Sequence, residues 1–440
     1  MENLHRSREW ADPFGEETTK ESPMLSRPPG IEDVFPDRVA VRDMITDTAR
    51  EVFRLHNYRE IIIPVVEFTE VFVRGLGDET DIVSKEMFTF EDRGGRSLTL
   101  RPEGTASVVR AYVENGEYNR LSTCKLFYAG PMFRAERPQK GRLRQFNQFG
   151  AELFGSGDPW YDFEVISMMD TIAKRVGIGD YSLLINSIGC PECRAGYVKE
   201  LDAYFRGRKN LLCKDCATRL ERNPLRLLDC KQDSCQPLKK DAPRTTSFLC
   251  PGCLAHHEAV KAHLSGSDIS FIEDHLLVRG LDYYTRTTFE FVATRLGGQN
   301  AFAAGGRYDN LVEGFGGKPT PAVGFAAGIE RMEILVGDRE TPSAGPDVYI
   351  VHSGGVTLDR ALFLCRHLRE SGISADLEPG SKGFRAQFKK ADREGTRCAL
   401  VIGEDELAAG SCTLKDLRSG EQESVAAGSL IERLHSIIEK

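Results

Sequence analysis

The sequence lacks any apolar stretch long enough to cross a lipid bilayer. A membrane-spanning helix needs about 18 or more consecutive apolar residues, and no run in these 440 residues approaches that length. The first 23 residues carry many charges and no apolar core, so they do not resemble a secretory signal. These absences argue against a membrane protein and favour a cytoplasmic one, with residues 1–24 as a disordered extension and Met24 as an alternative start.

The sequence also lacks an excess of positive charge, internal repeats and low-complexity tracts. Its 58 lysines and arginines are outnumbered by 66 aspartates and glutamates, which gives a formal net charge of −8. This balance argues mildly against a protein that coats nucleic acid, but it allows local basic faces. The length exceeds that of one ordinary core, so two or three domains are expected.

The patterns in residues 25–186 and 267–336 predict one α+β domain. A helical pattern covers residues 37–57, and an apolar strand at 60–66 contains Pro64, which indicates a sheet edge or a subunit contact. Neighbouring strands with few helices between them are typical of an antiparallel sheet. The further strands predicted in the first part cover residues 86–90, 97–101, 126–133 and 145–154.

Residues 347–440 predict a separate α/β domain, because strand and helix patterns alternate there. A linker rich in proline, glycine and serine is expected at 337–346. The predicted order is strand 348–351, helix 358–371, strand 374–377, helix 384–393, strand 398–402, a hairpin turning near 419–420, and helix 430–439.

Eight of the 12 cysteines lie in residues 187–266, a segment with amphipathic helical patterns that we interpret as an insertion into the first domain. They form four pairs: Cys190/Cys193, Cys213/Cys216, Cys230/Cys235 and Cys250/Cys253. Two such pairs make a tetrahedral thiolate zinc site, so eight thiolates fill two structural sites. Free thiols on helices remain the alternative, as does replacement of one cysteine ligand by His256 or His257. The other four cysteines (Cys124, Cys365, Cys398, Cys412) are expected to be buried.

A loop between the strands at 126–133 and 145–154 carries five basic residues against one acid, Glu136. Guanidinium groups on a short loop suit the bidentate capture of phosphate. The alternative is a solvated basic hairpin. The basic residues are Arg134, Arg137, Lys140, Arg142 and Arg144.

The order of residues around this loop is more specific than its composition. Phe133-Arg-Ala-Glu136, the basic loop, and Gln145-Phe-Asn-Gln-Phe-Gly-Ala-Glu152 resemble motif 2 of class II aminoacyl-tRNA synthetases, in the form found in histidyl-tRNA synthetases. Further blocks resemble the same family over a span from about residue 27 to the C-terminus. They are Leu98-Thr-Leu-Arg-Pro-Glu-Gly-Thr105, Leu277-Val-Arg-Gly-Leu-Asp-Tyr-Tyr-Thr285, Ala304-Gly-Gly-Arg-Tyr-Asp309 and the motif 3 stretch Pro321-Ala-Val-Gly-Phe-Ala-Ala-Gly-Ile-Glu-Arg331.

The resemblance implies a ligase that activates L-histidine with ATP and magnesium, forming histidyl-adenylate, and then transfers it to tRNA(His) with release of AMP and diphosphate. Arg134 would hold the α-phosphate, and Arg279 would supply charge that related enzymes take from a metal ion. The implied ATP-binding residues are Arg134, Glu136, Arg142, Phe146 and Arg331. The implied histidine-binding residues are Glu103, Thr105, Arg134, Gln148, Glu152, Arg279, Tyr283, Tyr284 and Tyr308, with Glu152 and Tyr284 gripping the imidazole nitrogens.

The resemblance further implies a class II catalytic domain with a six-stranded antiparallel sheet, a C-terminal anticodon-binding domain, and a homodimer with residues 37–66 at its interface. Arg137 and Gln139 would face the acceptor end of the tRNA. Lys382, Arg385 and Lys389, followed by Arg393, recur at helical spacing and would meet tRNA phosphates. A solvated charged face is the alternative for this helix.

Two other functions remain open from the sequence. Paralogues of histidyl-tRNA synthetases serve as regulatory subunits of ATP phosphoribosyltransferase, and other class II synthetases, such as the prolyl and threonyl enzymes, share motifs 2 and 3. The intact Arg279, Tyr283 and Tyr284 and the C-terminal domain disfavour the first alternative. The block from Leu277 to Thr285 disfavours the second.

Overall fold

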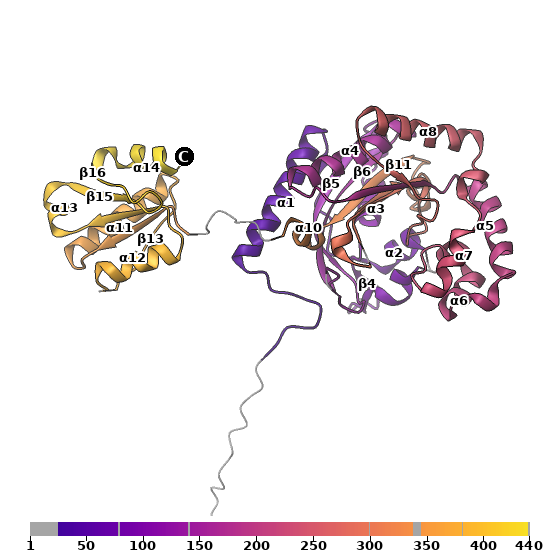
Figure 1. Cartoon of the computed structure of the whole chain (residues 1–440), viewed down its shortest axis with the longest axis horizontal. Helices are drawn as coiled ribbons and strands as arrows, with labels where there is room; N and C mark the ends of the chain where they lie inside the picture. The colour runs from indigo at the N-terminus through magenta and orange to yellow at the C-terminus, as the bar shows by residue number, and fades with distance from the viewer. Residues whose placement is uncertain are drawn as a thin grey trace, which may run out of the picture.

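The structure is a computed structural model that describes residues 25–77, 80–139, 141–298, 300–337, 345–380 and 382–438. The extension expected at 1–24, Lys140 of the basic loop and most of the linker expected at 337–346 lie outside these residues. Among the described residues, no helix has both the length and the apolarity needed to span a membrane. Figure 1 shows the C-terminal residues in yellow as a unit with its own sheet.

The main sheet has eight strands among the described residues, and its six central strands run antiparallel. The expectation of a six-stranded sheet was wrong at both edges, where a two-residue strand pairs in parallel. Strands this short show no period-2 pattern in a sequence. In spatial order the strands are β1 (Arg59–Glu60), β5 (Cys124–Phe133), β6 (Gln145–Phe154), β11 (Ala322–Gly328), β10 (Ala301–Arg307), β9 (Thr285–Val292), β7 (Ser182–Ser187) and β8 (Ile272–Glu273).

The two faces of this sheet differ because side chains alternate along each strand. In β6, Phe149, Ala151 and Leu153 point to a buried core shared with the helices, and Gln148 points to the opposite, open face, where it lines a cavity. The helices that cover the first face are α1 (Pro36–Leu55), α4 (Pro159–Arg175) and α10 (Ile329–Val336).

A smaller sheet begins beside the open face. Its first strand starts within the residues for which one longer strand, 60–66, was predicted. The strand expected at 60–66 ends at Glu60, and strand pairing resumes only at Val66. Pro64 has no N–H to donate, and Arg101 fills the gap by donating to the carbonyls of Ile63 (2.6 Å) and Pro64 (3.3 Å). The smaller sheet orders β2 (Val66–Phe68), β4 (Ser97–Leu100) and β3 (Phe88–Glu91), beside α2 (Thr69–Leu76), the short π-helix η1 (Ile82–Glu86), α3 (Thr105–Glu114) and α9 (Leu311–Gly314).

The cysteine-bearing segment is helical, as expected, and has a core of its own. Its last helix returns to the catalytic unit and packs on α4. Among the described residues its elements are α5 (Pro191–Arg206), the 3₁₀ turns η3 (Lys209–Leu211), η4 (Pro224–Leu227), η5 (Asp233–Cys235) and η6 (Thr245–Phe248), and the helices α6 (Lys214–Arg222), α7 (Gln236–Lys240) and α8 (Pro251–Gly266).

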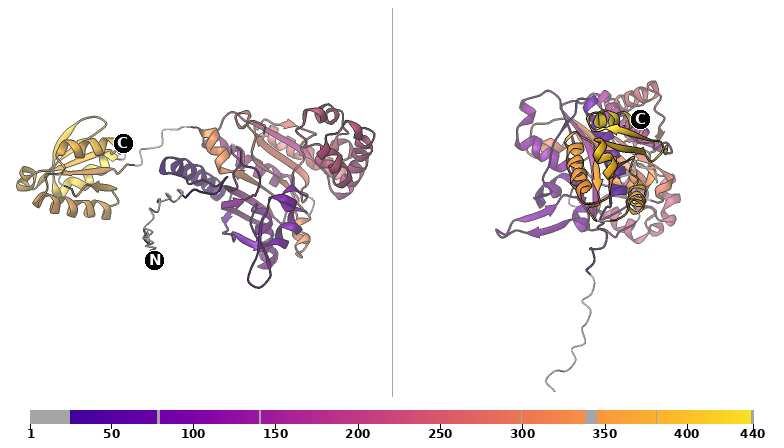
Figure 2. Two further views of the ribbon diagram at one scale, coloured as in Figure 1. Left: turned by 90° about the horizontal axis from the view of Figure 1, so that it is seen from below. Right: turned by 90° about the vertical axis from the view of Figure 1, so that its left-hand side faces the viewer.

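The C-terminal unit has a five-stranded mixed sheet with helices on both faces (Figure 2). Val348 and Ile350 face a core shared with the helices Val356–Glu370 and Leu430–Ile438, and Tyr349 and Val351 face the helix Phe384–Arg393. The predicted α/β pattern is confirmed, except that the six-residue helix α13 was not foreseen. In spatial order the strands are β13 (Ala375–Leu377), β12 (Val348–His352), β14 (Cys398–Ile402), β15 (Ser411–Asp416) and β16 (Gln422–Ala426), and the helices are α11 (Val356–Glu370), α12 (Phe384–Arg393), α13 (Glu404–Ala409) and α14 (Leu430–Ile438).

Candidate functional site

A cavity of about 580 Å³ lies against the open face of the main sheet. That volume is typical of a site for a small molecule or a nucleotide. The structure brings to its wall twelve of the thirteen residues predicted for catalysis, histidine or ATP. They are Glu103, Thr105, Arg134, Glu136, Arg142, Phe146, Gln148, Arg279, Tyr283, Tyr284, Tyr308 and Arg331.

One part of this wall is crowded with arginines. Arg134, on the loop after β5, donates from Nε to the carbonyl of Pro102 (3.0 Å), and its guanidinium lies 5.2 Å from the ring centre of Phe146. Arg331, in the first turn of α10, donates from Nε to the carbonyl of Gly141 (3.1 Å). Arg142 forms an ion pair with Glu136. Three guanidinium groups thus converge from two separate segments of the chain.

Burial disfavours the charged forms of two of these arginines. Burial, with added repulsion from Arg142 and Arg134, lowers the pKa of Arg331 to about 10. Burial also lowers the pKa of Arg134. A bound polyanion would relieve both effects, because it offers opposite charge and hydrogen-bond acceptors at once. This part of the cavity therefore suits the phosphates of a nucleotide.

Arg279 enters the cavity from the segment before β9. It forms an ion pair with Glu290 of β9, and its guanidinium lies 5.9 Å from the ring centre of Tyr284. Its Nε is buried without a hydrogen-bond partner among the described residues. Glu290 was not predicted from the sequence, because one acidic residue inside a strand pattern carries no signal of its own.

The adjoining part of the cavity holds acceptors for a small polar ligand. Gln148 carries a buried side-chain oxygen that has no hydrogen-bond partner among the described residues. Both carboxylate oxygens of Glu103 accept backbone N–H groups at the start of α3, from Thr105 (2.7 Å) and Ala106 (2.8 Å). Burial raises the pKa of Glu103 above its usual value, against the lowering effect of these bonds.

Glu152 is the one predicted residue of this group that does not line the cavity. It is fully buried behind the wall, where it accepts hydrogen bonds from the hydroxyls of Thr105 (2.6 Å) and Tyr308. Gly324 lies opposite in β11, and a Cβ there would approach a Glu152 oxygen to 1.8 Å, so a glycine is required. Burial raises the pKa of Glu152 to about 8.

The eight insertion cysteines gather into two groups of four. The first group is Cys190, Cys193, Cys250 and Cys253, and the second is Cys213, Cys216, Cys230 and Cys235; within each, the sulfur atoms all lie within 4.8 Å of one another. A tetrahedral zinc with bonds of about 2.3 Å places its sulfurs about 3.8 Å apart. The separations of Cys190 from Cys193 (3.5 Å) and of Cys213 from Cys230 (3.9 Å) are close to that value. Each group has the donors for one metal ion.

The alternative ligands His256 and His257 belong to neither group of four. The Nε2 atom of His256 lies 3.0 Å from Asp162, and that of His257 lies 3.3 Å from Glu273. Both histidines therefore join α8 to the catalytic unit. The four cysteines outside the insertion are buried, as expected.

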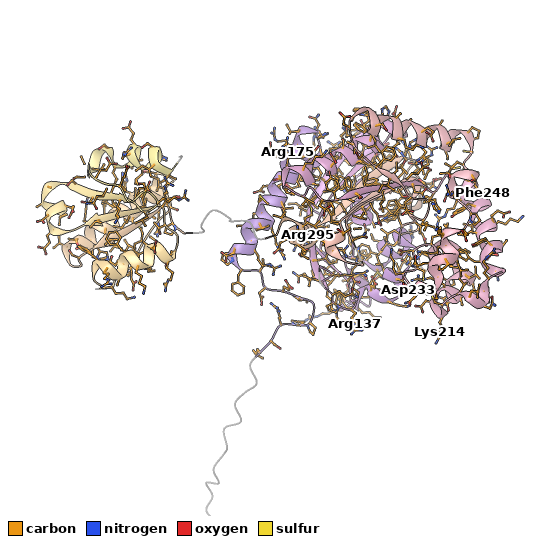
Figure 3. All side chains as sticks on the ribbon, in the orientation of Figure 1. Arg137, Arg175, Lys214, Asp233, Phe248 and Arg295 are labelled. Carbon is orange, nitrogen blue, oxygen red and sulfur yellow. The ribbon has the colours of Figure 1, made fainter. Side chains whose placement is uncertain are left out.

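The residues predicted to meet RNA are all exposed and lie outside the cavity. Arg137 and Gln139 lie on the basic loop between β5 and β6. Arg137 is labelled at the lower margin of the catalytic unit in Figure 3. Arg385, Lys389 and Arg393 lie on α12. Lys382 precedes that helix and is paired with Glu378 at 2.6 Å.

Comparison with known proteins gives consistent matches over most of the chain. A family model described as histidyl-tRNA synthetase matches residues 30–192 and 236–332, and one described as an anticodon binding domain matches 347–437. A histidine–tRNA ligase from Halothermothrix orenii is 47% identical over 417 residues, 94% of this chain and 100% of the relative. Another, from Moorella thermoacetica, is 48% identical over 413 residues, 93% of this chain and 97% of the relative.

Among solved structures, the apo histidyl-tRNA synthetase of S. aureus superposes with a TM-score of 0.79 at 36% identity. The alignment covers 93% of this chain and 100% of that one. The family model leaves out residues 193–235, and this unmatched stretch carries all four cysteines of the second group.

Proposed function

This chain belongs to the histidyl-tRNA synthetase family, and we propose how its own residues carry out the reaction. The chain is a histidine–tRNA ligase, which activates L-histidine with ATP and joins it to tRNA. Relatives of that name align over more than nine-tenths of the chain, which disfavours the regulatory paralogue and the prolyl and threonyl enzymes. Our division into a catalytic domain (25–186 and 267–336), an insertion (187–266) and an anticodon-binding domain (347–440) rests on the same likeness.

The proposed site rests on one observation: two polar side chains in the cavity each have a buried atom without a hydrogen-bond partner among the described residues. Arg279 has an orphan buried donor and Gln148 an orphan buried acceptor among the described residues. Buried polar groups normally have partners, because an unpaired one costs about 1–3 kcal/mol. An amino acid offers the two complements: its carboxylate accepts from Arg279, and its ammonium group donates to Gln148, Glu103 and Thr105.

The first step is attack of the histidine carboxylate on the α-phosphate of ATP, which enters as its magnesium complex, with diphosphate as the leaving group. Such transfers depend mainly on positioning and on neutralising charge. Arg134 and Arg279 would stabilise the charge at the α-phosphate, and Arg331 would hold the γ-phosphate. Phe146 would stack on adenine with the ring face that Arg134 leaves open, while Glu136 and Arg142 would hold the base and the phosphates.

The imidazole side chain would lie against Tyr283, Tyr284 and Tyr308. Glu152 would act from behind the wall. Its carboxylate accepts a hydrogen bond from the Tyr308 hydroxyl and would thereby fix Tyr308 against the imidazole ring of the substrate. A neutral imidazole has one donor and one acceptor, and a site that hydrogen-bonds both discriminates strongly against apolar side chains.

We assign zinc to both cysteine groups as a structural ion that holds the helices of the insertion together. Thiolate ligands in a closed tetrahedral set favour zinc and leave no open position for catalysis. We also propose that the enzyme is cytoplasmic, because reduced cysteines and a tRNA substrate both fit that compartment. Protein purified without chelators is expected to contain two zinc atoms per chain by elemental analysis, and less than a tenth of an atom would contradict the assignment.

We propose a homodimer, with its interface on the smaller sheet in place of the predicted 37–66. The apolar face of α1 is used by the chain's own core, which buries Ile45, Val52 and Phe53. The smaller sheet, in contrast, places Phe68 and Phe90 on either side of Leu98, and both phenylalanines are exposed. An exposed apolar face of this kind indicates an interface.

The dimer is tested by sedimentation equilibrium on Phe68→Asp/Phe90→Asp, with Leu121→Asp as a control at an exposed leucine elsewhere. We expect a monomer from the first variant and a dimer from the control. A dimer from both would exclude this face.

The function is tested by histidine-dependent exchange of diphosphate into ATP. We expect exchange with histidine and none with proline or threonine. No exchange with histidine, or exchange with another amino acid, would contradict the proposed reaction.

A further inference from the structure

The insertion forms part of the wall of the catalytic cavity. Seven of its residues, on α6 and in the stretch between α6 and α7, line the cavity: Asp215, Arg219, Arg226, Asp229, Cys230, Lys231 and Gln232. Cys230 is also a member of the second cysteine group. A proposed metal ligand and the substrates therefore share one wall.

Arg226 connects this wall to the segments that carry the catalytic arginines. Its side chain is only 12% exposed. One terminal nitrogen donates to the carbonyl of Gly280 (2.8 Å), the residue after Arg279, and the other pairs with Asp81 (2.7 Å). Val278, on the other side of Arg279, packs into the core of the insertion. The position of Arg279 is thus determined partly by the insertion.

The contact with Asp81 reaches the second catalytic arginine. Asp81 immediately precedes η1, and the carbonyl of Glu86 at the end of η1 accepts from the backbone N–H of Ala135 (2.7 Å). Ala135 follows Arg134 in the loop. Arg226 therefore contacts the segment that contains Arg279. It also contacts a second segment, which is hydrogen-bonded to the backbone next to Arg134.

The second cysteine group clamps the stretch of chain on which Arg226 lies. Arg226 is in η4, between Cys216 on α6 and Cys230. The buried ammonium group of Lys239 holds the end of this stretch through the carbonyls of Leu228 (3.0 Å) and Cys230 (2.7 Å). A metal ion bound to all four thiolates would fix both ends.

The first cysteine group meets the same segment farther along the chain, where Arg194, next to Cys193, donates to the carbonyl of Asp282 (3.2 Å). Its members lie where the insertion leaves β7 and where α8 begins, and none of them lines the cavity. The two groups thus offer the same chemistry at two distances from the substrates, which makes each the control for the other.

We propose that the second cysteine group is a metal site that controls histidine activation, and that Arg226 is the positioning residue that transmits its effect to Arg279 and Arg134. The proposal rests on zinc occupancy as assigned above. Metal binding would lower the barrier of the first step by fixing the two arginines, without any contact between metal and substrate.

The positioning role is tested with Arg226→Met, with Arg222→Met as a control at an exposed arginine of α6 outside the cavity wall. We expect kcat for histidine-dependent exchange to fall about tenfold or more in the first, because small misplacements of reacting groups are costly. The KM values for histidine and ATP should change less than threefold, and the zinc content should remain that of the parent. An unchanged kcat, or a loss confined to KM, would overturn the role.

The metal dependence is tested with Cys216→Ser/Cys230→Ser against Cys193→Ser/Cys253→Ser. Each is expected to lose one zinc atom, and the first should lose at least fivefold more kcat than the second. Reversible removal and return of zinc in the parent protein, with activity lost and regained, covers the case in which a serine variant fails to fold. Equal losses of kcat in the two variants, or full activity without metal, would overturn the proposal that the second cysteine group controls histidine activation. Absence of zinc from the parent would overturn the metal assignment, and Arg226→Met would still decide the positioning role.

Discussion

The catalytic cavity and the surface of α12 both present clusters of basic side chains, but in different environments. In the cavity, Arg134 and Arg331 are partly buried, and burial lowers the pKa of each. On α12, Arg385 and Lys389 are exposed. A buried guanidinium interacts strongly with an anion in the right place, because water does not screen the interaction. An exposed one interacts weakly and loses that attraction in salt. The same residue type thus gives geometric selectivity in one region and general attraction to phosphates in the other.

The largest effect expected from this comparison is that of Arg279→Ala in the cavity. Removal of one group that stabilises transition-state charge typically costs about 10²–10³ in kcat. We expect a loss of that size in the rate of adenylate formation, measured in a single turnover, with histidine binding weakened far less. Equal losses in rate and binding would mean that Arg279 only binds substrate.

Arg307 separates the effect of burial from a role in catalysis. Arg307 is fully buried and pairs with Asp162 (2.9 Å) and Asp309 (2.9 Å), away from the cavity wall. Removing one partner of a buried ion pair costs about 3–5 kcal/mol, so Arg307→Met should lower the free energy of unfolding by that amount. Urea unfolding followed through Trp160 on α4, in a Trp10→Phe background, measures it.

Arg331→Met is the matched comparison for Arg307→Met. It should weaken ATP binding about tenfold or more, by the loss of a charged hydrogen bond, with little loss of stability. A large loss of stability in this variant would mean that the cavity arginines are structural too.

The buried carboxyl group of Glu152 should make the stability of the protein depend on pH. Burial raises its pKa from 4.5 to about 8, so the folded chain holds this proton more tightly than the unfolded chain. Its contribution to stability is complete below about pH 4.5 and is lost as the pH rises through about 8. Glu152→Gln is neutral at every pH, so we expect its melting temperature to depend less on pH across that window.

Glu378, which is only partly buried, serves as a control of opposite sign for Glu152→Gln. A hydrogen bond from Lys382 lowers its pKa below 4.5, so its contribution to stability is lost on acidification instead. A parallel response of Glu378→Gln and Glu152→Gln between pH 5 and 8 would contradict the assignment of burial as the cause.

The smallest effect is expected on α12. Arg385→Ala/Lys389→Ala should weaken tRNA binding only about threefold to tenfold at low salt and reduce the salt slope by about 2, one for each lost phosphate contact. Arg360→Ala/Arg366→Ala on α11, against the other face of the sheet, controls for net charge. Diphosphate exchange should not change. A loss that persists at high salt would indicate specific contacts on α12.

Sequence patterns predicted the long elements well and the short ones badly. The strand at 145–154, the helix at 384–393 and the strand at 398–402 match the structure at both ends. The two-residue strand β8 and the helix α13 were missed, and the strand predicted at 60–66 overlaps the two-residue strand β1 only at Glu60. Periodicity needs several residues to show, whereas pairing at a sheet edge needs only two hydrogen bonds and a neighbouring strand.

The sequence by itself determined the reaction and most of the residues around the cavity, because their order carries a family resemblance that composition does not. It also determined that eight cysteines suffice for two metal sites. Only the tertiary structure decided which four cysteines form each group, because ligand sets depend on distances between residues up to 63 positions apart, such as Cys190 and Cys253. It alone placed Glu152 behind the wall and brought Arg226 against the segment of Arg279, since no local pattern records a contact between segments that meet only when the chain folds.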